Sequence, residues 1–115
     1  MKPNVIIIMA DQLRLDALGR GFTPNIDSIR ESGVDFRRAY CACPLCVPAR
    51  GAFFTGKYPN TNGSLINPWL PYDSYYGDVH KGIENLYSMM EKDWCSIHSG
   101  KQHLFTEGGK LQFLI

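Results

Sequence analysis

The apolar run at residues 4–9, NVIIIM, constrains the fold more than any other feature of the chain. Its β-branched side chains follow one another from Val5 to Ile8, a pattern typical of a strand that is buried on both faces. Strands of this kind belong to parallel sheets that are covered by helices. The sequence therefore predicts an α/β fold with a mostly parallel sheet flanked by helices.

The segments after this run alternate between helical and extended patterns. Thr23 suits the N-cap of a helix at residues 24–32, with Pro24 at its first position and Gly33 after its end. The remaining predicted elements are helices at residues 49–55 and 83–93, a strand at residues 94–100, and a short strand or extended segment at residues 34–40. We expect residues 4–9 and 94–100 to form neighbouring parallel strands.

The length and net charge of the chain limit the kinds of partner that it is expected to bind. The 115 residues suffice for one domain with a modest core. With 12 basic and 11 acidic residues the net charge is +1, so neither a nucleic acid nor an anionic membrane surface is expected as a partner. No apolar run approaches the roughly 18 residues that a membrane span needs.

The N-terminal apolar run is too short for a signal peptide, because Asp11 interrupts it. We therefore expect a cytoplasmic protein as the sequence is written, and a periplasmic or secreted one if a leader has been removed.

The cysteines allow several interpretations. Cys41, Cys43 and Cys46 lie close together, whereas Cys95 is distant. Disulfides are not expected, because there is no secretion signal and the three clustered thiols are too close to join distant segments. Zinc is disfavoured, because neither Cys95 nor His80 belongs to a second ligand pair of the usual spacing. Packing is the expected role of Cys41 and Cys43.

Cys46 has surroundings that suit a nucleophile. It comes just before a predicted helix with Pro48 in its first turn, where unpaired N–H groups and the helix dipole favour an anion. Arg50, one turn later, adds a planar cation. These residues are consistent with a nucleophile that faces an oxyanion such as sulfate or phosphate. They are equally consistent with a buried thiol beside a surface arginine.

Four segments together resemble one enzyme family. Residues 46–59, CVPARGAFFTGKYP, resemble the sulfatase signature C-x-P-x-R followed by a short helix and TG-R/K-YP. Residues 2–19 resemble the sulfatase opening strand with its acidic metal-binding turn, and residues 23–40 resemble the segment that leads to the signature. SGKQHL, at residues 99–104, resembles the downstream G-K-x-H-L motif. The chain thus resembles the formylglycine-dependent sulfatases of the alkaline phosphatase superfamily.

The resemblance implies roles for five residues. A formylglycine-generating maturation enzyme would read the motif formed by Cys46, Pro48 and Arg50. Cys46 would become formylglycine (3-oxoalanine), whose hydrated aldehyde attacks sulfur, and Arg50 would hold and orient it. Lys101 and His103 would contact the sulfate and the hydrated aldehyde.

The resemblance also implies a metal site at Asp11 and Gln12. The expected ion is Ca²⁺, or another divalent cation such as Mg²⁺ or Mn²⁺, because oxygen-rich sites suit hard cations better than zinc. Many sulfatases have two consecutive aspartates here, so Gln12 would supply an amide oxygen with less charge.

Sulfatases run to several hundred residues, so we expect residues 1–115 to be the N-terminal part of a sulfatase catalytic domain whose C-terminal remainder is absent. The expected function is hydrolysis of a small-molecule or sugar sulfate ester, with little activity for this part alone. The alternatives are a phosphonate or phosphate ester hydrolase of the same superfamily and a non-catalytic anion-binding chain. Exposed apolar edges would favour self-association.

Overall fold

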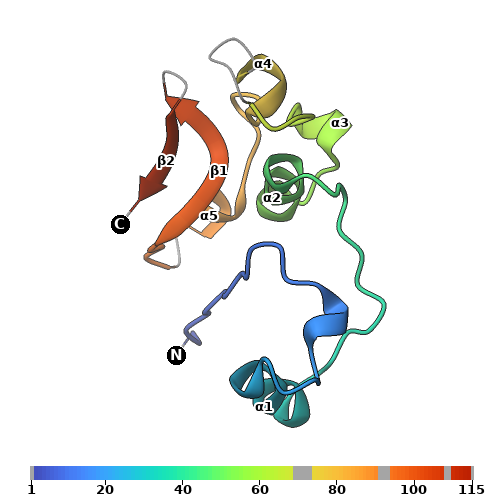
Figure 1. The fold of residues 1–115 in the computed structure, drawn as a ribbon. Coiled ribbons are helices and arrows are strands. Elements are labelled where there is room, and N and C mark those ends of the chain that lie inside the picture. Colours follow the sequence, from blue (N-terminus) through green and yellow to red (C-terminus); the bar gives the residue numbers. More distant parts are fainter. Residues whose placement is uncertain (1, 69–73, 91–93, 108–109, 115) are drawn as a thin grey trace. The chain divides into compact units, whose positions relative to one another are not determined.

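The computed structural model describes residues 2–68, 74–90, 94–107 and 110–114 (Figure 1). The chain divides into an N-terminal unit, Met1–Ala39, and a C-terminal unit, Tyr40–Ile115.

The N-terminal unit contains a short 3₁₀ helix, η1 (Leu15–Ala17), and one α-helix, α1 (Pro24–Ser32). The prediction of α1 is confirmed, with Thr23 before it and Gly33 after it. The Thr23 side chain does not bond a helix N–H group. Its hydroxyl instead donates to the carboxylate of Asp27 at 3.2 Å, so Thr23 supports α1 through a neighbouring side chain.

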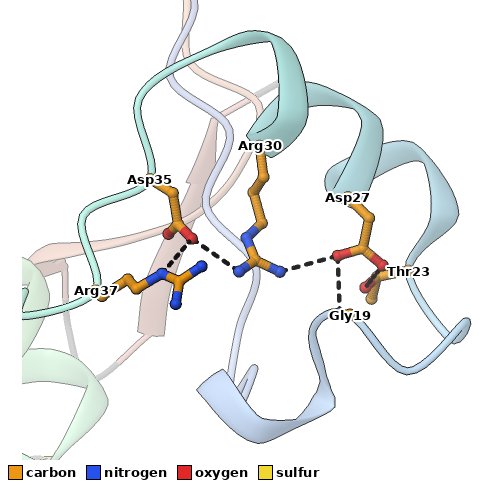
Figure 2. A network of polar contacts seen from close by, with 6 residues as sticks. All are labelled: Gly19, Thr23, Asp27, Arg30, Asp35 and Arg37. Carbon is orange, nitrogen blue, oxygen red and sulfur yellow. Dashed lines mark hydrogen bonds and ion pairs between the residues drawn. The ribbon is translucent and has the colours of Figure 1, made fainter.

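A polar network joins the turns on either side of α1 (Figure 2). The Asp27 carboxylate accepts from the Gly19 N–H at 2.9 Å and from Arg30 Nη1 at 3.1 Å. Arg30 Nη2 donates to Asp35 Oδ2 at 2.8 Å, and Arg37 Nε lies 3.4 Å from the same oxygen. The hydrogen bond from Arg30 is the main cause that lowers the pKa of Asp35.

The strand predicted at residues 4–9 is wrong, and of the two forms predicted for residues 34–40, a short strand or an extended segment, the strand is excluded. Residues 4–9 and 34–40 are not part of a strand, and Ala39 N–H donates instead to Phe36 O in a turn at 3.4 Å. Ile6 and Ile8 are 83% and 85% exposed. A strand is stabilised by hydrogen bonds to a neighbour, and the described residues of this unit contain no strand that could supply them.

The C-terminal unit is organised around helix α2 (Cys46–Thr55). This helix packs against α3 (Pro59–Asn62), α5 (Leu86–Met90) and strand β1 (Gly100–Glu107), whereas the short helix α4 (Ser74–Gly77) contacts β1 (Figure 1). Phe54, Val79 and Leu104 form a buried hydrophobic cluster, with Ile83, Leu86 and Tyr87 packed against it.

Helix α2 is longer at its start than predicted, because it begins at Cys46 rather than at residue 49. Pro48 is tolerated there since the first N–H groups of a helix have no intrahelical acceptor. The predicted end is confirmed: Gly56 has a left-handed φ of 65°, and its N–H donates to Ala52 O at 2.9 Å. Glycine adopts this conformation at little steric cost.

The pairing of strands differs from the prediction. β1 begins at Gly100, so residues 94–99 are not a strand, and it pairs antiparallel with β2 (Lys110–Leu114). The register joins Gly100 to Leu114 and Glu107 to Lys110, with an irregularity between Lys101 and Thr106. Parallel strands need a long crossover connection, whereas adjacent segments pair antiparallel through a short one. The expected parallel sheet is therefore not present among the described residues.

The helix predicted at residues 83–93 is present in part, as α5, and its predicted end at residues 91–93 lies outside the described residues. Within the described ranges, no helix combines the length and hydropathy needed to cross a bilayer.

Candidate active site

The start of α2 holds the half-buried side chain of Cys46. The residue before the helix, Leu45, has no polar side chain that could accept from the first N–H groups. The acceptor comes from a distant loop instead. Asn67 Oδ1 accepts from Val47 N–H at 2.9 Å and from Cys46 Sγ at 3.5 Å.

Arg50 joins this helix to β1. It lies one turn after Cys46 and therefore on the same helix face. It is only 7% exposed, and its Nη1 donates to the main-chain oxygen of Lys101 at 2.7 Å. The structure thus brings the elements that carry Cys46, Arg50 and Lys101 into contact. Pro48, the remaining residue of the predicted maturation motif, is fully buried in the first turn of α2.

His103 lies on β1 two residues after Lys101, in the irregular part of the strand. It is 5% exposed and has a left-handed φ of 59°. This region is unfavourable for residues with a β-carbon, and such strain is concentrated at functional sites. Arg50 and Lys101 add two cations to the same pair of elements, an arrangement that suits an oxyanion.

The predicted metal ligands belong to the N-terminal unit. Asp11 and Gln12 form an exposed turn, and Gln12 has a left-handed φ of 55°. A carboxylate and an amide oxygen fit Ca²⁺, Mg²⁺ or Mn²⁺ by chemistry. These two side chains cannot complete a calcium site alone, since calcium takes about 6–8 oxygen ligands. In the part of the chain that the structure describes, no three His, Cys, Asp or Glu side chains are grouped to hold a metal.

All four cysteines are free thiols. Cys43 is half-buried, as a packing residue can be, but Cys41 is exposed and the prediction that it packs is wrong. Cys41 precedes α2 in a part of the chain with no assigned helix or strand, so no element covers its side chain. Cys95 is also exposed.

Tyr87 and His98 contact each other and pack against Phe54 of α2. The Tyr87 hydroxyl and His98 Nδ1 lie 2.6 Å apart, and the Tyr87 ring stacks on Phe54 with centroids 5.3 Å apart. Burial raises the pKa of Tyr87, although a hydrogen bond with Gln102 opposes this effect. The phenol therefore stays protonated near neutral pH and can support the helix that carries Cys46 and Arg50.

Sequence reasoning did not identify Asn67. It lies in a loop rich in proline, glycine and asparagine, and its distance from Cys46 along the chain hides their contact. The sequence signal for it is negative: the Leu45 side chain cannot cap α2, so the first N–H groups of the helix need acceptors from elsewhere.

Comparison with known proteins identifies one family. The family model described as sulfatase matches residues 3–104. An arylsulfatase of Clostridium perfringens is 40% identical over 115 aligned residues, which cover 93% of this chain and 22% of the relative. An ulvan-active sulfatase of Formosa agariphila is 40% identical over 76 residues, which cover 61% of this chain and 15% of the relative.

Human steryl-sulfatase is 42% identical over 67 residues, which cover 54% of this chain and 12% of the relative. The chain therefore spans about a fifth or less of the length of these relatives. No solved structure matches the chain.

Proposed function

Because the chain belongs to the sulfatase family, we propose that it supplies the nucleophile and the anion-binding residues of a sulfuric ester hydrolase. The observation that carries the proposal is the hydrogen bond of 2.7 Å from Arg50 to Lys101 O. It joins the helix that begins at Cys46 to the strand that carries Lys101 and His103. The substrate class is a small-molecule or sugar sulfate ester.

Cys46 is the proposed nucleophile after conversion to formylglycine by a maturation enzyme. In this conversion the bond between the β-carbon and sulfur breaks, the sulfur leaves as sulfide, and an oxygen atom takes its place as the carbonyl oxygen. The two electrons released in this oxidation pass to an acceptor such as dioxygen, which the maturation enzyme uses as its co-substrate. The hydrated aldehyde provides a hydroxyl that attacks sulfur, and it avoids the stable thiosulfate ester that a thiol would form.

Arg50, Lys101 and His103 are the proposed contacts of the sulfate group. Arg50 holds the side chain of residue 46, and its buried guanidinium is already oriented by Lys101 O. The Lys101 ammonium compensates the negative charge that develops on the sulfuryl oxygens. His103 is proposed to bind the sulfate and the hydrated aldehyde, with its strained backbone fixing the imidazole.

Asp11 and Gln12 are the proposed protein ligands of a calcium ion. When bound, the ion would polarise the sulfuryl oxygens. The left-handed Gln12 is consistent with a turn shaped for ligation. In the complete catalytic domain, we further propose the mostly parallel sheet of an alkaline-phosphatase-like α/β fold.

The test is a chimera in which this chain replaces the aligned segment of the Clostridium perfringens arylsulfatase, expressed together with a maturation enzyme. Peptide mass spectrometry should show an aldehyde at residue 46 and unchanged thiols at Cys41, Cys43 and Cys95. The chimera should hydrolyse an aryl sulfate faster than an aryl phosphonate. Cys46→Ala should abolish turnover, whereas Cys43→Ala should preserve it.

Either of two outcomes would contradict the proposal and favour another function. Faster hydrolysis of the phosphonate would assign the site to phosphonate or phosphate esters. A folded, converted chimera that binds sulfate but turns over neither ester would identify a non-catalytic anion-binding chain.

A further inference from the structure

Helix α2 is capped by a residue from outside the helix. The first N–H groups of a helix need acceptors, and these usually come from the side chain just before the first turn. Leu45 occupies that position and has none. Asn67 Oδ1 replaces it by accepting from Val47 N–H at 2.9 Å. The start of α2 therefore depends on an asparagine from a separate loop.

The same oxygen also contacts the proposed nucleophile. Cys46 Sγ lies 3.5 Å from Asn67 Oδ1 in a geometry that makes the thiol the donor. An amide oxygen has two lone pairs, so it can accept from Val47 N–H and from the Cys46 side chain together. Asn67 thus fixes the backbone and the side chain at the start of α2 with one atom.

The loop that carries Asn67 is held on both sides of this residue. Before it, Ile66 N–H donates to Tyr76 O at 3.1 Å. After it, the ring of Pro68 packs against Gly77, where a β-carbon would lie 2.7 Å from Pro68 Cδ. Only glycine permits this approach. The position of the Asn67 oxygen is therefore built into the fold.

We propose that Asn67 is a positioning residue that favours the hydrate of the converted residue 46. The inference rests on the proposed conversion of Cys46 to an aldehyde. An aldehyde has no hydrogen to donate to the Asn67 oxygen, whereas its hydrate has two hydroxyl groups. A hydrogen bond at this acceptor therefore stabilises the hydrate and leaves the aldehyde unaffected.

The chemical balance of this step is simple. The oxygen of a water molecule bonds to the aldehyde carbon, and one proton of that water moves to the carbonyl oxygen, without oxidation or reduction. Because only the hydrate has a hydroxyl that can attack sulfur, Asn67 raises the reactive fraction. By holding one hydroxyl, it also directs the other away from the loop.

The hydrate and the aldehyde can be counted by ¹³C NMR of the converted chain labelled at the cysteine β-carbon. Asn67→Ala should lower the ratio of hydrate to aldehyde by about threefold to tenfold, as expected for one hydrogen bond. Asn67→Asp retains an acceptor oxygen and should preserve the ratio. Asn60→Ala, at an exposed asparagine on α3, is the matched control and should leave it unchanged.

A second measurement uses the unconverted chain. With Cys41, Cys43 and Cys95 replaced by serine, the S–H stretching band reports on Cys46 alone. Asn67→Ala should shift this band to the higher frequency of a thiol without a hydrogen bond. Conversion is checked separately by mass spectrometry, so a failure to convert Cys46 counts against the proposed function alone.

The capping and positioning roles are separated by Leu45→Ser/Asn67→Ala, in which serine restores a cap to α2. This double variant should keep the thermal stability of the wild type but retain the low hydrate ratio and the shifted S–H band. If the band and the ratio instead match the wild type in a folded Asn67→Ala or double variant, Asn67 is only a helix cap and the inference is wrong.

Discussion

At the scale of single residues, Arg50 shows how the site is held together. Burying a guanidinium is costly unless its donors are satisfied, and hydrogen bonds from a charged group contribute about 1.5–3 kcal/mol. The bond to Lys101 O meets part of this need and ties α2 to β1. Lysine would not replace Arg50, because it lacks the planar fork that can serve a carbonyl and a substrate together.

Asn62 is a second buried polar residue on which α2 depends. It is 0% exposed, and its Nδ2 donates to Thr55 Oγ1 at 3.2 Å and to Lys57 O at 3.1 Å. Its Oδ1 accepts from Ser64 N–H at 2.9 Å. Asn62→Ala would leave these groups unsatisfied and should lower the free energy of unfolding by about 1–3 kcal/mol.

Urea unfolding checks this prediction. Asn60→Ala is the control, because Asn60 lies exposed on the same short helix. Equal stability of the two variants would show that the Asn62 network contributes little.

At the scale of elements, the charged network around α1 predicts a dependence on pH. The Arg30 hydrogen bond lowers the pKa of Asp35 from its ordinary value, although desolvation opposes the shift. A carboxyl whose pKa is depressed on folding stabilises the fold above its unfolded pKa, and this contribution is lost as pH falls through the folded pKa. The turn after α1 should therefore loosen below about pH 4.

NMR chemical shifts of residues 33–37 during an acid titration provide the measurement. Asp35→Asn should already show the loosened turn at neutral pH. A wild-type turn whose chemical shifts stay constant until α1 itself unfolds would contradict the assigned role of Asp35.

The elements differ in how far the sequence predicts them. Helices α1 and α2 carry their own signals, such as Pro24 at a first position and Gly56 after an end, so their existence and C-terminal ends were predicted correctly. The start of α2 was missed because its cap, Asn67, is remote along the chain. The predicted strands failed because β-branched residues favour extended backbone but do not supply a partner.

In the candidate site, too, features within one segment could be predicted, whereas contacts between distant segments could not. Cys46, Pro48 and Arg50 lie within a single helical segment, so their relation could be predicted from spacing. The hydrogen bond from Arg50 to the main-chain oxygen of Lys101 could not be predicted from the sequence, because it depends on how β1 packs against α2. The left-handed backbone of His103 arises from an irregular strand pairing that carries no local sequence signal.

At the scale of the whole molecule, the N-terminal unit has no core of its own, since none of its described residues is buried. The apolar run at residues 4–9 is exposed instead, and the exposed fractions of Ile6 and Ile8 are 83% and 85%. Extended apolar segments with unpaired edges favour association. The chain should therefore self-associate as its concentration rises, and Ile6→Lys/Ile8→Lys should reduce this.

Light scattering over a concentration series measures the effect. Ile29→Lys, on the exposed surface of α1, is the control for added charge and should have a smaller effect. A monomer at every concentration would contradict the prediction.

The 115-residue chain should by itself be a poor catalyst. Asp11 and Gln12 offer two ligand side chains, and water would have to complete a coordination sphere of about 6–8 oxygens. Calcium should therefore bind weakly, and little would polarise the sulfuryl oxygens. Even with Cys46 converted, the chain should hydrolyse an aryl sulfate far more slowly than the Clostridium perfringens arylsulfatase, in parallel assays with calcium. A comparable rate would mean that these residues form a complete site.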